Sequence, residues 1–310
     1  MPKQSAHRQT DDGQQQMYQS NTKRRFLNMK TIDKTVLAGY NAGIEFNRLN
    51  EGIGRIEFAY TKELLVSHLP PPPTVIYDIG GGYGEYAWWL TALGYEVHLF
   101  DLAETNIAMS VSLSEQYPGC HLHAAEVCDA RCVPRADHTA DAVLLMGPLY
   151  HITEYEERIA AMSECKRLLR PGGILFAAAL TPYSVLLHCI TVYRTEHSAK
   201  RTALDDPVFL AMVARELDDG HHENPDRSVY DGLGTSHLHT AAALRDELAA
   251  GGFPDADIHG VMGGAWLAPD LDTLWDDPAC RETLMKTVRM LDGHKEIMGL
   301  SGHLLGICKS

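Results

Sequence analysis

Short apolar runs recur between residues 75 and 180, separated by stretches with the apolar spacing of helices. The runs lie at residues 75–79, 95–102, 120–126, 140–147 and 174–180. Their length and their aliphatic, β-branched and aromatic residues favour buried strands. The stretches 84–93, 104–116 and 154–169 are expected to be helices, ended by Gly94, Pro118 and Pro171. Strands that alternate with helices, without hairpin signals, pair in parallel through right-handed crossovers. The pattern therefore predicts a doubly wound α/β sheet with helices on both faces.

The segments around this region predict a cap and a lid. Residues 1–28 are polar and expected to be disordered, or to be an arm that orders over a ligand or over the second copy of a homodimer. Residues 29–73 are helical in pattern until the prolines at 70–73, and form an N-terminal helical cap. Residues 181–239 are expected to be a helical lid inserted after the fifth strand, over the carboxyl ends of the strands. The last two strands, at 256–261 and 304–308, complete a seven-stranded, mostly parallel core domain made of residues 74–180 and 240–310.

Composition and charge argue against several classes of protein. The 310 residues carry a formal net charge of -14, which argues against broad binding to nucleic acid or to an anionic membrane. The seven cysteines show no C-x-x-C pair and no disulfide-like framework. No apolar run has the length of a membrane-spanning helix, and no signal-peptide pattern is present. We expect a soluble, cytoplasmic protein.

A glycine-rich turn follows the first strand and offers a ligand site. Its sequence is Asp78-Ile79-Gly80-Gly81-Gly82-Tyr83-Gly84-Glu85. A strand, a glycine turn and a helix N-terminus together suit a nucleotide-like ligand. Dinucleotide folds place a third glycine where this chain has Glu85. The acid Asp78 inside the strand end suits a cationic amino group better than a pyrophosphate.

The second strand ends at Asp101, about 20 residues beyond the glycines, where an acid accepts hydrogen bonds from ribose hydroxyls in nucleoside-binding folds. Further motifs follow in order. They are Cys128-Asp129-Ala130, the run from Leu144 to His151, and Leu169-Arg170-Pro171-Gly172-Gly173. Together with the glycine turn, this series resembles the class I S-adenosylmethionine (SAM) dependent methyltransferases, in their bacterial small-molecule branch. Residues 263–271 and 301–305 also look like that branch.

The resemblance implies SAM as cofactor, a small organic molecule as methyl acceptor, and a set of site residues. Cofactor contacts are expected from Asp78, Gly80, Gly81, Gly82, Gly84, Asp101, Leu102, Asp129, Ala130 and Met146. Asp129 would meet the adenine amino group. Arg55 would pair with the methionine carboxylate. His151, after the fourth strand, is the candidate general base, because a neutral imidazole suits that role at neutral pH. Tyr150 would orient the acceptor or contact the methionine moiety. Acceptor contacts are expected from Tyr40, Tyr183, His239 and Trp266.

Several alternatives stay open at this point. His151 has an equally good explanation as a residue that only orders its loop. A tRNA or protein methyltransferase shares the cofactor, an NAD-dependent oxidoreductase shares the fold, and a SAM-binding regulator needs no acceptor. The histidines and acids of the lid lack H-E-x-x-H or comparable spacing, so no metal is expected. The acceptor atom, whether oxygen, nitrogen, carbon or sulfur, does not follow from the fold.

Overall fold

The computed structural model describes residues 34–41, 47–191, 204–224 and 234–310. The chain divides into two units, residues 1–32 and 33–310, and every described residue belongs to the second. The expected arm at residues 1–28, with its suggested role in a homodimer, lies outside the described residues. Among the described residues, every helix is too short or too polar to cross a lipid bilayer.

A seven-stranded sheet forms the centre of the second unit, in the order β3-β2-β1-β4-β5-β9-β8. Only β9 runs against its neighbours, pairing antiparallel with β5 and with β8. The predicted seven-stranded, mostly parallel sheet is thereby confirmed. The strands are β1 (Val75–Ile79), β2 (Glu96–Asp101), β3 (Ala124–Val127), β4 (Ala140–Leu145), β5 (Leu169–Leu180), β8 (Asp257–Gly260) and β9 (His303–Lys309).

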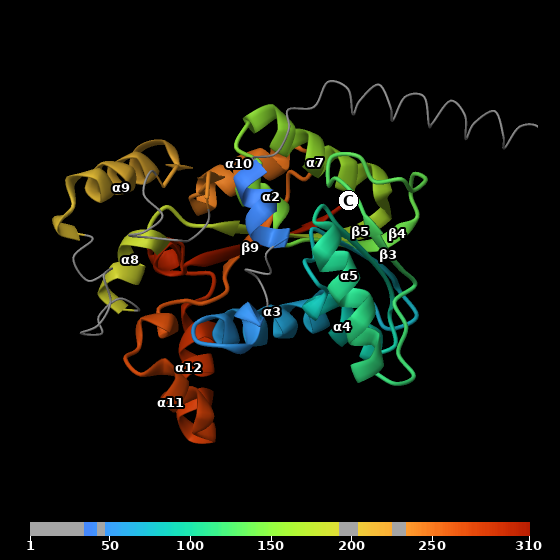
Figure 1. The fold of residues 1–310 in the computed structure, drawn as a ribbon, viewed down its shortest axis with the longest axis horizontal. Helices are drawn as coiled ribbons and strands as arrows, with labels where there is room; N and C mark the ends of the chain where they lie inside the picture. Colours follow the sequence, from blue (N-terminus) through green and yellow to red (C-terminus); the bar gives the residue numbers. More distant parts are fainter. Residues whose placement is uncertain (1–33, 42–46, 192–203, 225–233) are drawn as a thin grey trace, which may run out of the picture. The chain divides into compact units, whose positions relative to one another are not determined.

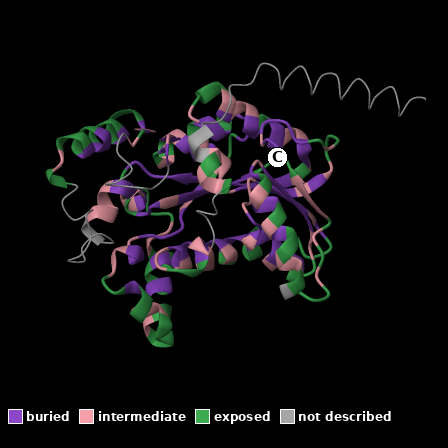
Figure 2. Ribbon diagram, viewed as in Figure 1, coloured by how far each residue is buried: buried purple, intermediate pink, exposed green. Residues whose placement is uncertain are grey.

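Helices cover both faces of the sheet, as expected for parallel strands. One face carries α3 (Gly54–His68), α4 (Glu85–Ala92), α5 (Glu104–Leu113) and α12 (Pro278–Leu291), and the other carries α7 (Tyr155–Leu168) and α10 (Ala241–Ala250) (Figure 1). Successive strand residues alternate between the faces, so Ile76 belongs to the first apolar cluster and Tyr77 to the second. Figure 2 shows the strands as the most continuously buried part of the ribbon.

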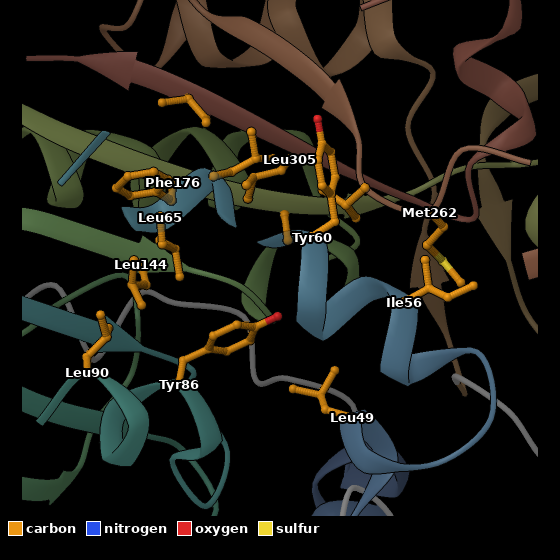
Figure 3. Packing of buried hydrophobic residues seen from close by; sticks show 14 of the residues in the cluster. Leu49, Ile56, Tyr60, Leu65, Tyr86, Leu90, Leu144, Phe176, Met262 and Leu305 are labelled. Atoms are coloured by element: carbon orange, nitrogen blue, oxygen red, sulfur yellow. The ribbon is translucent and has the colours of Figure 1, made fainter. Parts of the chain in front are cut away.

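The cap is anchored on the first face by its helix α3. It consists of α2 (Lys34–Asn41), the short helix η1 (Arg48–Asn50) and α3. Ile56 and Leu65 of α3 lie in one cluster with Leu144, Phe176 and Leu305 of the sheet (Figure 3). Burying one aliphatic side chain of this size stabilises a fold by roughly 1.5–3 kcal/mol, so the cap is part of the core.

The described part of the lid is not purely helical. It contains α8 (Ser184–Thr191) and α9 (Pro207–Asp219), and also a two-stranded antiparallel sheet of β6 (His221–His222) and β7 (Ser236–His237). The strand β7 contacts the short helix α6 (Pro148–His151), which follows β4. The lid therefore reaches the segment that carries His151.

Several boundaries differ from the sequence predictions, and three of the differences have a local cause. Residues 148–152, expected as a loop, begin with the helix α6, because Pro148 at its first position has a backbone preset for a helix. Strand three begins at Ala124, since residues 117–120 form a turn closed by the amide of Cys120 on Tyr117. Strand five begins at Leu169, because the register shifts around the Pro-Gly-Gly turn and Leu169 already pairs with Ala140. The remaining short elements are η2 (Ser114–Gln116), η5 (Ala265–Leu267), α11 (Leu271–Asp276) and η6 (Lys295–Leu300).

Candidate active site

The glycine turn connects β1 to α4 in a conformation that requires glycine. Gly80, Gly82 and Gly84 have φ angles of +71°, +60° and +91°, which side-chain-bearing residues rarely adopt. Gly81 has an ordinary backbone, but a Cβ there would lie 2.5 Å from the Asp78 carboxyl and 2.6 Å from Leu99. The turn is thus folded tightly over Asp78, at the carboxyl ends of β1 and β2.

Asp78 is a buried carboxylate without a partner. The side chain is fully buried, and neither oxygen has a hydrogen bond of normal geometry in the described residues. Burial, followed by the charge of Asp101, raises the pKa of Asp78 to about 7, although the nearby Ala87 amide opposes this. Isolated buried carboxylates are costly unless a cation or donors meet them. The amino group of a methionine moiety is such a cation, so this position fits SAM.

Asp101 is fixed in place at the end of β2. One carboxylate oxygen accepts from the Gly82 amide at 2.8 Å, and the other accepts from the Ala103 amide at 2.8 Å and from Asn106 Nδ2 at 3.0 Å. These bonds orient the carboxylate at the strand end, the position at which nucleoside-binding folds place an acid for the ribose hydroxyls. Asn106, in the first turns of α5, was not identified from the sequence.

Asp129 lies after β3, but its carboxylate is engaged within the chain. Arg131 donates to it at 2.6 Å and 2.9 Å, and both side chains are buried. Arg131 also bonds Glu157 at 2.9 Å. The adenine contact of Asp129 stays a prediction, and Arg131 is a neighbour that the sequence reasoning missed. Leu102 and Ala130, predicted to line the same edge, are both partly exposed.

The segment after β4 brings Met146, Tyr150 and His151 close to the glycine turn. The Tyr150 hydroxyl donates to the Met146 carbonyl at 3.3 Å. A Cβ on Gly147 would lie 3.0 Å from the Gly80 carbonyl oxygen. The rings of Tyr150 and His151 meet edge to face with centroids 4.6 Å apart. The predicted catalytic residues therefore lie at the same sheet edge as the predicted cofactor residues.

The environment of His151 makes it a weak base. Its Nε2 is hydrogen-bonded to the hydroxyl of Tyr40 in the cap, while its buried Nδ1 has no partner in the described residues. Burial, followed by the positive charge of Arg48, lowers the pKa of His151 to about 3. The imidazole is thus neutral across the physiological range, and Tyr40 lies directly beside it, while its contact with an acceptor stays a prediction.

The cap closes over the glycine turn through η1. The amide of Asn47 donates to the Tyr83 hydroxyl at 2.8 Å, and Asn50 Nδ2 donates to Glu85 at 2.5 Å. Between them, Arg48 bonds Glu57 of α3 at 2.7 Å. Arg48 and Glu57 line a small cavity of about 30 Å³ together with Tyr86, Met146 and His303. The sequence reasoning had not identified Arg48, Glu57 or His303.

Arg55 has other partners than the one predicted. It donates to Asp276 of α11 at 3.0 Å and to the Asn50 carbonyl at 2.7 Å. It lines an open groove of about 390 Å³ with Lys62 and Trp275, and the structure does not place it among the residues around Met146. Arg48 is the cap arginine that lies there.

The other three predicted acceptor contacts are placed as follows. Tyr183 is partly exposed at the start of α8 and packs closely against Gly299. Trp266 is buried in the first apolar cluster and donates to the Leu300 carbonyl at 2.7 Å. His239 is fully buried, and its Nε2 lies 3.0 Å from Glu247. The structure thus gives Trp266 and His239 internal packing partners.

A histidine and acid cluster in the lid is explained by an ion pair. His237, His239 and Glu247 bring possible ligand atoms within 4.8 Å of one another. However, Arg158 donates to both oxygens of Glu247, at 2.6 Å and 2.8 Å, and to the carbonyls of Ile152 and Thr153. The arginine therefore already supplies the compensating cation, and the network anchors the end of α6 to α10.

Comparison with known proteins identifies the central region. Residues 77–177 match a family model described as "Methyltransferase domain". A malonyl-[acyl-carrier protein] O-methyltransferase of Methylococcus capsulatus is 33% identical over 129 residues, covering 40% of this chain and 45% of that protein. A "Probable tRNA methyltransferase 9B" of Mus musculus is 27% identical over 173 residues, covering 53% of this chain and 34% of that protein. The chain spans less than half the length of these relatives.

A solved structure agrees with the fold assignment. A SAM-dependent methyltransferase from Methanosarcina mazei, 17% identical, superposes with a TM-score of 0.51 over 80% of this chain and 96% of that one. The strand order of the sheet is consistent with this likeness. Residues 77–177 therefore form a methyltransferase domain, carried on the class I fold of the SAM-dependent methyltransferases.

Proposed function

We propose that this chain transfers the methyl group of SAM to a small organic acceptor. The observation that carries the proposal is the buried carboxylate of Asp78 under the glycine turn, whose oxygens have no hydrogen bond of normal geometry within the described part of the chain. Asp101, fixed by three hydrogen bonds at the next strand end, adds a place for a ribose. A bound SAM would supply an electrophilic methyl group on a sulfonium.

The residues of this chain would contribute positioning and exclusion of water. Asp78 would hold the amino group, and Asp101 the ribose. Tyr40 of the cap bonds His151, and β7 of the lid contacts α6, so the edge beside Met146 is covered from two sides. Such enclosure favours a reaction in which orientation and desolvation provide much of the acceleration.

A small acceptor is supported by this enclosure and by charge. His151 is buried beneath α2, which leaves little access for a folded macromolecule. The net charge of -14 disfavours RNA, which needs a basic surface. A relative named as a tRNA methyltransferase keeps RNA as the second candidate. All seven cysteines are free thiols, which fits the cytoplasm as the site of action.

Titration calorimetry with S-adenosylhomocysteine and with NADH tests the cofactor assignment. We expect binding of the first and not of the second, and loss of affinity in Asp78→Asn. Release of S-adenosylhomocysteine is then measured with a panel of small hydroxyl, amine and carboxylate compounds and with bulk tRNA. Methylation of tRNA alone would replace the small-acceptor proposal, and failure to bind S-adenosylhomocysteine would refute the enzyme assignment.

A further inference from the structure

A second imidazole lies at the edge of the sheet where the parallel strands end. His303 is the first residue of β9 and pairs with Leu180, the last residue of β5. Its side chain is mostly buried, and Nδ1 lies 3.3 Å from Glu57 Oε1 of α3. Both residues line the cavity that also contains Met146 and Tyr86. His303 therefore lines the same cavity as Met146, a residue of the predicted cofactor site.

Glu57 is built to remain charged. Burial alone would raise its pKa, but Arg48 and His303 outweigh burial and hold the pKa below its usual value. Arg48 approaches with two nitrogens, at 2.7 Å and 3.4 Å. The other titratable group of the cavity is Tyr86, whose pKa burial raises well above its ordinary value, so it stays neutral. The cavity thus contains one fixed carboxylate next to one imidazole.

A carboxylate at Nδ1 prepares a histidine for proton abstraction. It fixes the tautomer in which Nδ1 carries the hydrogen, so Nε2 is the basic nitrogen, and it stabilises the imidazolium that forms. His151 has no such carboxylate, and its lowered pKa leaves it a poor acceptor of a proton from a hydroxyl. The structure therefore favours His303 over His151 for this task.

The cavity also indicates what the acceptor brings to it. A volume of about 30 Å³ accommodates a group the size of one water molecule. A hydroxyl has this size, and it must lose a proton during methylation, unlike a carboxylate that is already ionised. A polar lining of Arg48, Glu57 and His303 suits a hydroxyl better than a methyl or methylene carbon.

We propose that His303, oriented by Glu57, is the general base for an acceptor whose reacting group is a hydroxyl, of a phenol or an alcohol. This inference rests on the proposed methyltransferase function. The acceptor oxygen bonds the methyl carbon as the carbon–sulfur bond breaks, the bond pair goes to sulfur, and the hydroxyl proton goes to His303 Nε2. The charge of the new imidazolium is then balanced by Glu57.

Substituted phenols of graded acidity, with aliphatic alcohols, amines and carboxylic acids for comparison, test the proposal through release of S-adenosylhomocysteine. In His303→Gln we expect kcat/KM for weakly acidic phenols to fall by about 10²–10⁴-fold, with S-adenosylhomocysteine affinity unchanged by calorimetry. The loss should shrink for 4-nitrophenol, which is far more acidic than phenol itself and is already about half ionised at neutral pH. His151→Gln is the matched control, and should keep the dependence on phenol acidity seen in the unmodified protein.

The pH profile separates a base from a structural residue. If His303 is the base, kcat should rise with pH as His303 loses its proton. This rise should vanish in His303→Gln. Its midpoint should shift in Glu57→Gln, where the orienting carboxylate is lost. An equal loss for all phenols, an unchanged pH profile, or methylation of amines or carboxylates alone would overturn the proposal. If Glu57→Gln does not fold, the pH profiles of His303→Gln and His303→Asn test the proposal instead. Because S-adenosylhomocysteine binding is measured separately, these failures are distinct from failure of the enzyme assignment.

Discussion

Replacing Asp78 by asparagine should remove a pH dependence from cofactor binding. In the unmodified protein the pKa of Asp78 is raised to about 7, first by burial and then by Asp101. An ammonium group pairs only with the ionised carboxylate. The affinity for S-adenosylhomocysteine should therefore increase as the pH rises through 7, and the complex should release a proton when it forms at lower pH.

The size of this effect follows from the ionised fraction. With a pKa of about 7, the affinity should be about tenfold greater at about pH 8 than at about pH 6, provided the bound cofactor keeps the group ionised.

The raised pKa of Asp78 also lowers the stability of the fold, because the folded-state pKa lies above the ordinary value of 3.8. Stability is unaffected below that ordinary value, decreases as the pH rises from it to about 7, and is constant above that pH. At high pH, the free energy of unfolding of Asp78→Asn should thus exceed that of the unmodified protein by roughly 1–3 kcal/mol. The gain is limited because the buried asparagine amide also lacks a hydrogen-bond partner among the described residues.

Calorimetry in buffers of different ionisation enthalpy measures both the affinity and the released protons. Asp78→Asn should bind S-adenosylhomocysteine weakly and with a flat pH profile. Its free energy of unfolding in urea should exceed that of the unmodified protein at about pH 8, and the difference should disappear near pH 4. A tenfold pH dependence that persists in Asp78→Asn would refute the reasoning, because another group would then be responsible.

Three further changes test the surroundings of the site. Gly81→Ala should destabilise the fold and abolish S-adenosylhomocysteine binding, because the new Cβ would lie 2.5 Å from the Asp78 carboxyl. Gly82→Ala has open space around the Cβ, so urea unfolding should show only the backbone strain, about 1–2 kcal/mol. Asp101→Ala should weaken S-adenosylhomocysteine binding by about 1–2 kcal/mol, and unchanged calorimetric affinity would reject its ribose role. Glu247→Gln should lower the free energy of unfolding by about 3–5 kcal/mol, because Arg158 stays buried, while the double change Arg158→Met, Glu247→Leu should recover most of it.

The sheet could be predicted because its central strands are buried on both faces. Strands such as β1 and β4 read as nearly continuous apolar runs, and glycine or proline separates them from the helices. The glycine turn and the acids at the strand ends follow from the same logic, since parallel strands end at one edge. Asp78 and Asp101 were therefore chosen by their positions at strand ends, and Asp129 by the resemblance to the methyltransferases.

Contacts between distant segments could not be predicted in this way. Arg55 was chosen in the cap for its charge, but the path of the chain through η1 places Arg48 near Met146 instead. His303 meets Glu57 only because α3 lies against the start of β9, and no local pattern in the sequence gives that pairing. Arg131, two residues after Asp129, is the exception, since a basic residue at that spacing can bond the acid locally.

Two buried carboxylates on one sheet edge have opposite surroundings, and this difference assigns them different tasks. Asp78 has a raised pKa and no hydrogen-bond partner among the residues that the structure describes, whereas Glu57 has Arg48 and His303 as partners and a lowered pKa. Titratable groups whose surroundings shift their pKa values in opposite directions serve distinct steps of a reaction. Asp78 would respond to the charge of the cofactor, and Glu57 would support the proton transfer through His303. The pH dependence of S-adenosylhomocysteine affinity and that of kcat should therefore be separable, because Asp78→Asn should flatten the first and leave the second in place.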